Sequence, residues 1–334
     1  MNISEFAKEA GVSKSAVSRY FNDGYLSGNK RMLIEEAIQR TGYSPGTAAH
    51  SVKTRVTKLI GVIIPKLSSE SCSRVAEGIS NVLNSEGYEL LLVNTSNDCE
   101  KEISSLELFR KSRVDGVILL ATVFTDLHKT LLKKMRVPTV IVGQQLQGFN
   151  CVCYDDEGAS YDLTRLMLSK GAKKPGFIGV TMRDMAAGKA RWDGFRRALE
   201  ESSVEIPKKF TETAEFTMDS GYEKAKKMLS SRDIPDCLFC ATDTIALGAM
   251  LYCREAGIDI PGDMMIASVG DTKAGKVAYT PLTTAHFHYK TAGIDAAQML
   301  LHELKRGDDS ICRTLRIDYE LVERESTMKL CETN

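Results

Sequence analysis

Residues 14–22 carry the side chains best suited to reading DNA bases. The segment is predicted as a helix with one apolar face and one polar, cationic face. The polar face and the turn before it contain Ser13, Lys14, Ser15, Ser18, Arg19 and Asn22. An arginine can donate two hydrogen bonds to guanine, and a lysine can reach guanine or a phosphate. We therefore expect this face to contact base edges in a major groove.

Three predicted helices hold that face in place. They cover residues 2–10, 14–22 and about 29–41, each with an apolar stripe. Gly11 can adopt the positive φ that ends a helix, and Ser13 is a good N-cap for the next one. Ala7, Gly11 and Val17 have the spacing of a helix-turn-helix. Any three-helix bundle shows apolar stripes, but the cationic start of the second helix favours DNA binding.

The distribution of charge supports a polyanion partner for this part of the chain alone. The 334 residues contain 44 Lys+Arg and 44 Asp+Glu, a balance that by itself argues against nucleic-acid binding. The first 58 residues contain nine basic and five acidic residues, so they carry +4 and the remaining 276 carry −4. A basic head on an acidic body is the asymmetry expected when only the head meets DNA.

Residues 44–57 are predicted as a hinge between head and body. Ser44 and Pro45 can cap and open a helix, but the small residues after them are too few to form a stable helix alone. The residues leave two interpretations open, a helix that orders only on DNA and a plain polar linker.

From Lys58 onward, apolar runs alternate with amphipathic helices. Strands are predicted over residues 59–64, 89–93, 114–120, 137–142, 152–154, 176–180, 236–241 and 264–269. Helices are predicted over residues 73–86, 158–170, 190–201, 221–231 and 245–256. Continuously apolar strands are buried on both faces, as in doubly wound parallel sheets. This length exceeds one such sheet, so we expect two α/β lobes with a ligand cleft at the carboxyl ends of the strands.

Other classes of protein are not favoured. The first ten residues do not resemble a secretion signal, and no apolar run reaches the ~18–20 residues of a membrane span. Nine cysteines, an odd number, fit reduced cytoplasmic thiols, and Cys237 and Cys240 lie in an apolar run where we expect burial. The sequence has no P-loop, HExxH or Ser-His-Asp arrangement, and no GxGxxG after a strand. We therefore expect a cytoplasmic protein that is not an enzyme and takes no cofactor or metal.

Motifs along the whole chain resemble those of the LacI/GalR repressor family. They are residues 7–19 (AKEAGVSKSAVSR), 41–45 (TGYSP), 58–65 (KLIGVIIP), 114–118 (VDGVI), 241–250 (ATDTIALGAM), 281–284 (PLTT) and 321–326 (LVERES), in family order. The resemblance implies an all-α helix-turn-helix head (1–43), a hinge helix and linker (44–57), and a two-lobed α/β sensor like the periplasmic binding proteins (58–334). Its N lobe would cover about 58–155 and 289–314, and its C lobe about 156–288 and 315–334.

The same resemblance implies a partner and further DNA contacts. The protein would act as a homodimer, with a tetramer also open, on a pseudo-palindromic operator. Besides the helix face, the matching DNA-binding positions are Tyr43, Ala49, His50, Val52 and Lys53. Val52 matches the residue that opens the central base step from the minor groove. The family usually has Leu there and Arg in place of His50, so we expect a less stable hinge helix in this chain.

The resemblance also implies which residues bind a small effector. The matching positions are Ser71, Thr122, Gln144, Asp184, Arg191, Phe216, Thr242, Asp243, Asp271 and Phe287. Arg191 matches a ligand-clamping arginine, and Asp271 matches an acid that pairs with ligand hydroxyls or amines. A guanidinium, carboxylates, an amide and a ring face are the groups that recognise a sugar. Arg191 and Asp271 could instead be structural ion-pair partners.

These observations together predict a repressor of a carbohydrate-utilisation operon, controlled by a sugar or sugar phosphate. Ser71 and Cys72 replace two aromatic residues that relatives often carry, which argues against a flat purine held by stacking. Residues 17–25 and Gly143–Gln144 most resemble regulators of sucrose or related sugar operons. The alternatives are a regulator of a non-sugar metabolite and a transport-type sugar-binding protein without a DNA role.

Overall fold

The computed structural model describes residues 3–21, 24–43, 56–306 and 311–328, and the chain divides into two compact units, 1–57 and 58–334. The first unit contains α1 (Ile3–Glu9), α2 (Lys14–Phe21) and α3 (Gly28–Thr41), which confirms the three predicted helices. The predicted DNA contacts at Asn22, Ala49, His50, Val52 and Lys53, and most of the predicted hinge, lie outside the described residues.

A small apolar core holds the three helices of the head together. Phe6, Val17 and Ile34 are fully buried, and the Phe6 ring stacks on Tyr43 with 4.1 Å between centroids. Gly11 adopts a φ of 65° in the turn between α1 and α2, as its spacing predicted. A side chain at this φ is strained, which is why glycine suits the turn of a helix-turn-helix.

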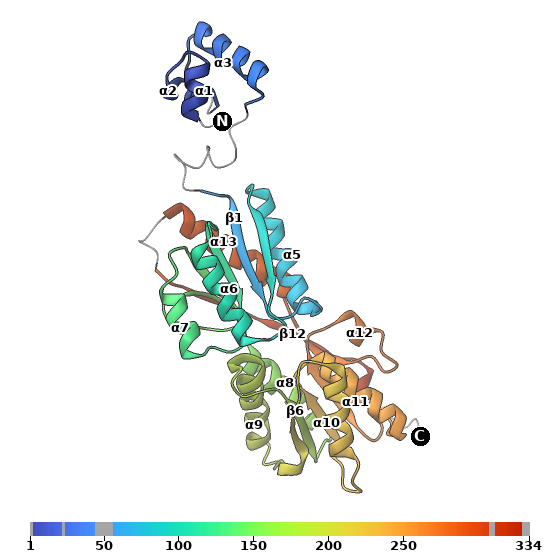
Figure 1. The fold of residues 1–334 in the computed structure, drawn as a ribbon. Coiled ribbons are helices and arrows are strands. Elements are labelled where there is room, and N and C mark those ends of the chain that lie inside the picture. The colour runs from blue at the N-terminus through green and yellow to red at the C-terminus, as the bar shows by residue number, and fades with distance from the viewer. Residues whose placement is uncertain (1–2, 22–23, 44–55, 307–310, 329–334) are drawn as a thin grey trace. The chain divides into compact units, whose positions relative to one another are not determined.

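The N lobe of the second unit is a parallel sheet with helices on both faces. Its strands are β1 (Leu59–Ile64), β2 (Glu89–Asn94), β3 (Gly116–Leu120), β4 (Thr139–Val142), β5 (Asn150–Tyr154) and β11 (Thr314–Ile317), in the order β11-β5-β4-β3-β1-β2. Ile60 and Val62 pack with α5 (Glu70–Ser85) and α13 (Tyr289–Arg306). Ile63 packs on the opposite face with α6 (Cys99–Lys111) and α7 (Asp126–Lys133). Figure 1 shows α5 and α13 side by side.

The C lobe repeats this arrangement. Its strands are β6 (Pro175–Gly179), β7 (Thr211–Thr213), β8 (Cys237–Cys240), β9 (Met265–Val269), β10 (Thr283–Phe287) and β12 (Tyr319–Val322), in the order β12-β10-β9-β8-β6-β7. All neighbours are parallel except β12, which runs antiparallel to β10. One face packs on α8 (Asp156–Ser169) and α9 (Arg191–Glu201), the other on α10 (Met218–Leu229) and α11 (Asp243–Ala256). Shorter helices are the π-helical turn η1 (Met185–Ala190), η2 (Lys208–Phe210), α12 (Lys273–Lys276) and η3 (Glu325–Thr327).

The sheet edges differ from the sequence-based expectation. Strand β2 was expected to be buried on both faces, but it is the edge strand next to β1, and Leu91 and Leu92 are 40% and 37% exposed. An edge strand lacks a neighbour on one side, so helices need not cover it fully. Strands β7, β11 and β12 and helices α6, α7 and α13 are additions to the predicted elements.

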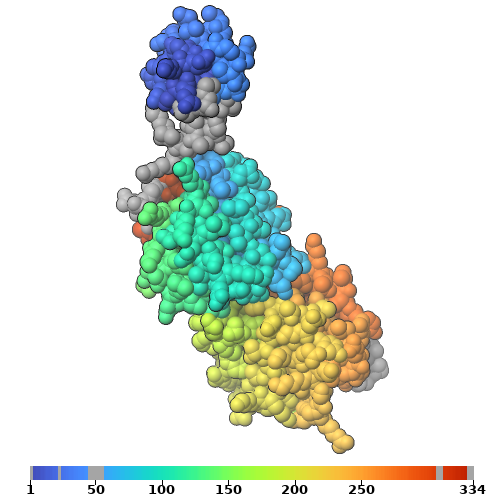
Figure 2. Space-filling model, viewed as in Figure 1, coloured from blue at the N-terminus to red at the C-terminus, as the bar shows by residue number. Residues whose placement is uncertain are grey.

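The chain passes between the two lobes three times. The passages follow Tyr154 in β5, Phe287 in β10 and Ile317 in β11. In Figure 2 the N lobe, in cyan and green, adjoins the C lobe, in yellow and orange, on one face of this unit. No helix in the described ranges is both long and apolar enough to span a membrane.

Candidate ligand cavity and nucleic-acid interface

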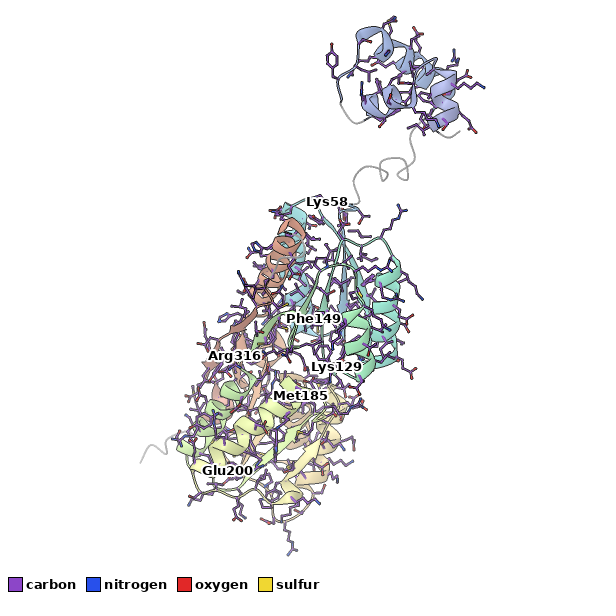
Figure 3. All side chains as sticks on the ribbon, turned by 90° about the vertical axis from the view of Figure 1, so that its left-hand side faces the viewer. Lys58, Lys129, Phe149, Met185, Glu200 and Arg316 are labelled. Carbon is purple, nitrogen blue, oxygen red and sulfur yellow. The ribbon has the colours of Figure 1, made fainter. Side chains whose placement is uncertain are left out.

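A cavity lies between the two lobes, at the carboxyl ends of their strands. Its inner chamber has a volume of about 400 Å³ and is lined by segments that follow β1, β3, β4, β6, β8 and β9. An outer chamber of about 1000 Å³ shares Lys66, Thr122, Asp184 and Phe216 with it. Met185, at the start of η1, lies near the boundary of the lobes in Figure 3. Ligands of doubly wound sheets bind at this edge, so the position fits a ligand site.

Most of the predicted effector residues line the inner chamber. These are Ser71, Thr122, Gln144, Asp184, Arg191, Phe216, Thr242 and Asp243. Asp271 and Phe287 do not line it, although they lie next to residues that do. The chamber also includes Glu70, Tyr154, Asp156 and Tyr289, which were not predicted as ligand residues. Tyr154 and Asp156 flank the end of β5, so the carboxyl-edge rule could have found them.

Arg191 is held by a buried ion pair. Its Nη2 lies 2.7 Å from Asp156 Oδ1, its Nε donates to the same oxygen at 2.8 Å, and its Nη1 donates to the carbonyl oxygen of Ala241. Burial raises the pKa of Asp156, while the charge of Arg191 acts in the opposite direction. Arg191 is therefore both a structural ion-pair partner and a lining residue.

Gln144 and Asp184 connect the lobes across the cavity. Gln144 Nε2 donates to Asp184 Oδ1 at 2.9 Å, and the same oxygen accepts from the backbone N–H groups of Ala186 and Ala187 at 3.0 Å. Burial, with a smaller effect from the nearby Asp156, raises the pKa of Asp184 from 3.8 to about 6. Asp184 is therefore mostly ionised at pH 7 and gains a proton as the pH falls through about 6.

Tyr154 and Tyr289 line the chamber, and the Phe287 ring packs behind Tyr154. The Tyr154 ring stacks on Phe287 with 4.9 Å between centroids, and Tyr289 meets Tyr154 edge-on at 5.2 Å. Phe287 is fully buried, so it supports the Tyr154 ring. The Tyr154 hydroxyl is inaccessible to solvent and has no hydrogen-bond partner among the residues that the structure describes.

The other two acids of the predicted site are bound by the C lobe itself. Asp243 accepts hydrogen bonds from the hydroxyls of Ser268, Thr272 and Thr284. Asp271 lies behind the chamber, where its carboxylate meets Arg324 Nη2 at 2.5 Å. Lys276 Nζ and His286 Nδ1 lie 2.9 and 2.8 Å from the same carboxylate. These contacts are those of a structural ion-pair partner, which was the alternative to a ligand-binding role for Asp271.

These contacts make the stability of the sensor depend on pH. Burial alone would raise the pKa of Asp271, but the hydrogen bonds from Arg324, Lys276 and His286 outweigh it and lower the pKa from 3.8 to about 2. We expect Asp271→Asn to reduce the free energy of unfolding by roughly 2 kcal/mol at pH 7. Because the folded pKa is depressed, this contribution is present above about pH 4 and is lost as the pH falls toward 2. Urea unfolding should give a smaller difference between wild type and variant at pH 3 than at pH 7.

The residues predicted to contact DNA differ in their exposure. Lys14, Ser15 and Arg19 are exposed, and the Ser13 hydroxyl accepts a hydrogen bond from the backbone N–H of Ala16 at 3.2 Å, as an N-cap does. Tyr43 differs, because its side chain is buried against Phe6 in the head core. The exposed cations of α2 are Lys14 in its first turn and Arg19 in its last turn.

Cys237 and Cys240 lie in β8 and are 1% and 0% exposed, which confirms the expectation that this CxxC is part of the core. Burial raises the pKa of Cys240 well above its ordinary value. A thiol in this environment is a poor nucleophile and a poor metal ligand.

Comparisons with known proteins match both units. Residues 2–46 match the family described as bacterial regulatory proteins, lacI family, and residues 164–327 match the family described as periplasmic binding protein-like domain. The HTH-type transcriptional repressor PurR of Haemophilus influenzae (strain PittEE) is 30% identical over 98% of this chain and 99% of its own. The sucrose operon repressor of Staphylococcus xylosus is 32% identical over 91% of this chain and 95% of its own. The solved structure of the lac repressor dimer bound to operator and the anti-inducer ONPF has a TM-score of 0.82 at 20% identity, covering 98% of this chain and 99% of that chain.

Proposed function

Because this chain belongs to the lacI family of bacterial regulatory proteins, we propose that it represses a carbohydrate-utilisation operon and senses a sugar between its lobes. Membership makes it an effector-controlled, DNA-binding transcription regulator and not an enzyme. It also overturns the alternative of a transport-type protein without a DNA role.

The observation that carries the carbohydrate proposal is the composition of the inner chamber. The carboxylate of Asp184 and the amide of Gln144 lie on the same cavity as the rings of Tyr154 and Phe216. Carboxylates and amides bind vicinal hydroxyls, and ring faces pack against the apolar C–H face of a sugar. The outer chamber leaves room for a second sugar unit.

A non-sugar effector, such as a purine base, is the second candidate, because the similarity to the HTH-type transcriptional repressor PurR is as extensive as that to the sucrose operon repressor. Ser71 lines the chamber where a stacking ring would hold a flat base, and its hydroxyl lies 2.8 Å from that of Ser69. Hydroxyls at this position suit a polyol better than a planar heterocycle.

The test combines operator selection with effector titration. The full chain is used to select binding sites from random duplex DNA at physiological salt, and monosaccharides, disaccharides and purine bases are then titrated into the complex. A pseudo-palindromic site whose affinity changes roughly 5–150-fold with a sugar supports the proposal. A complex that responds to a purine base and to no sugar would contradict the carbohydrate part.

The proposal assigns base reading in a cytoplasmic regulator to Lys14 and Ser15 in the first turn of α2 and to Arg19 in its last turn. We expect Arg19→Ala to weaken binding to the selected operator by about 1–3 kcal/mol while binding to random DNA changes little. Arg40→Ala is the matched control, because Arg40 on α3 pairs with Glu9 at 3.2 Å in the same head. Gel shifts on specific and scrambled duplexes measure both, and an equal loss on the two duplexes would assign Arg19 to phosphate contact only.

We further propose that the chain acts as a homodimer through the exposed edge of the N-lobe sheet, with a tetramer also open. Leu91 and Leu92 on β2 are exposed leucines at that edge, one on each face of the sheet because consecutive strand residues alternate. A dimer through this edge would cover exposed apolar surface and place two heads on two half-sites. Leu92→Lys should shift sedimentation toward the monomer, whereas Leu127→Lys, at a 51% exposed leucine of α7, should not.

A further inference from the structure

Four helices begin at the wall of the inner chamber. They are α5, α8, η1 and α11, and each has an acidic residue at its first position or N-cap, namely Glu70, Asp156, Asp184 and Asp243. All four of these residues line the chamber. Helix N-termini attract anions, so four of them around one cavity would favour a phosphate. In this chain, however, a carboxylate already lies at each of them.

The cations of the chamber are also engaged. Among the described lining residues, Lys66 and Arg191 are the basic ones. The guanidinium of Arg191 bonds Asp156 and the carbonyl of Ala241, and Lys66 Nζ donates to the carbonyl oxygen of Phe216 at 2.8 Å. Glu70 Oε1 is already paired with Arg74 Nη2 at 2.6 Å, so the two basic lining residues face three further acids, Asp156, Asp184 and Asp243. Lys66 keeps N–H groups beyond its bond to Phe216, but a phosphate that accepted from them would lie beside carboxylates of its own sign.

The same chamber offers groups that suit an uncharged polyol. In the contacts of the described residues, Asp156 and Asp184 use only their Oδ1 atoms, so the second oxygen of each can accept a hydrogen bond from a ligand hydroxyl. Tyr154 adds a buried hydroxyl without a partner among the described residues. Burial raises the pKa of Tyr154 well above its ordinary value, so this hydroxyl stays protonated and can donate. A buried donor without a partner is costly, and a ligand oxygen would remove that cost.

From this arrangement we propose that the effector is an uncharged, hydroxyl-rich molecule and not a sugar phosphate, and that the Tyr154 hydroxyl donates to it. The inference rests on the proposed function, because it takes the cavity as the effector site of a carbohydrate regulator. To the proposed function, the inference adds that the effector is uncharged and that Tyr154 is one of the residues that bind it.

Paired ligands test the charge class. The full chain is assayed by thermal shift and calorimetry with sucrose, trehalose, glucose and fructose, each beside its 6-phosphate. We expect at least one neutral sugar to bind and its phosphate to bind about tenfold or more weakly. A phosphate that binds as tightly as its neutral partner, or more tightly, overturns this inference and leaves the proposed function standing. Binding of adenine or hypoxanthine with neither a sugar nor a sugar phosphate bound contradicts both the inference and the proposed function.

Two variants test the residues with the neutral sugar that binds. Tyr154→Phe should weaken binding roughly 5–10-fold, as the loss of one hydrogen bond does. Tyr319→Phe is its control, because the Tyr319 hydroxyl donates to Asp162 at 2.6 Å and Tyr319 does not line the chamber. Asp184→Asn keeps an Oδ1 atom that can accept from the backbone N–H groups of Ala186 and Ala187 but removes the negative charge. The ratio of the affinity for the neutral sugar to the affinity for its phosphate should therefore fall several-fold. The proposal is contradicted if Tyr154→Phe binds the neutral sugar as tightly as wild type, or if the ratio of the two affinities is the same in Asp184→Asn as in wild type.

Discussion

Arg191→Ala should destabilise the sensor unit by about 3–5 kcal/mol and abolish its response to the effector. The Arg191 side chain is 7% exposed and lies 2.7 Å from Asp156, which is 4% exposed. Truncation leaves a buried carboxylate without its cation, one of the most costly changes a folded chain can undergo. Urea unfolding of the full chain measures the first effect, and titration of the operator complex with the effector measures the second.

The defect should depend on pH. Burial raises the pKa of Asp156 even with Arg191 in place, and loss of the cation would raise it further. The cost of burial falls on the ionised form, so protonation of Asp156 relieves it. The stability difference between Arg191→Ala and wild type should therefore be smaller at pH 5 than at pH 8. A difference that grows as the pH falls would mean that the ion pair is not its source.

A second substitution separates structure from binding. Adding Asp156→Asn to Arg191→Ala removes the unpaired charge, so most of the lost stability should return. The effector response should stay absent, because the guanidinium is still missing from the chamber wall. If stability and response returned together, Arg191 would act only by holding the fold.

The fold was predictable where burial leaves a clear pattern. Strands β1, β3 and β9 are enclosed by helices on both faces, so their sequences are continuously apolar and their positions follow directly. Strand β11 is mostly exposed and short, so it lacks that signal and was not predicted. Helices α6 and α7 were missed as well, and a buried pair between them, His128 and Glu102 at 3.3 Å, is visible only once the chain has folded.

The candidate site was predictable as a set of loops but not as a set of contacts. Parallel strands bring the loops at their carboxyl ends together whatever the side chains are, so Gln144, Asp184 and Thr242 converge as expected. Which acid pairs with which base depends on packing between distant segments. Arg324 reaches Asp271 from the last part of the described chain, and no local spacing indicates that contact.

Phe6→Ala should abolish operator binding while leaving the sensor intact. Phe6 is fully buried at the centre of the head, where its ring stacks on Tyr43 and lies 6.5 Å from Phe21. Truncating a buried phenylalanine costs about 3–5 kcal/mol, and a domain as small as this head has roughly that much stability in total. We therefore expect the head to unfold, with the operator complex absent in gel shifts at concentrations that saturate wild type.

Because the chain divides into two compact units, Phe6→Ala should unfold the head and leave the sensor folded. The thermal transition of residues 58–334 and their affinity for the effector should match wild type, because Phe6 belongs to a separate core. Leu33→Ala is the matched control, since this α3 leucine is 38% exposed and its truncation should cost little. Retained operator binding in Phe6→Ala would show that DNA stabilises the head by more than the lost core contacts. A weakened sensor would instead show that the two units are energetically coupled, so that head and cavity must be measured as one system.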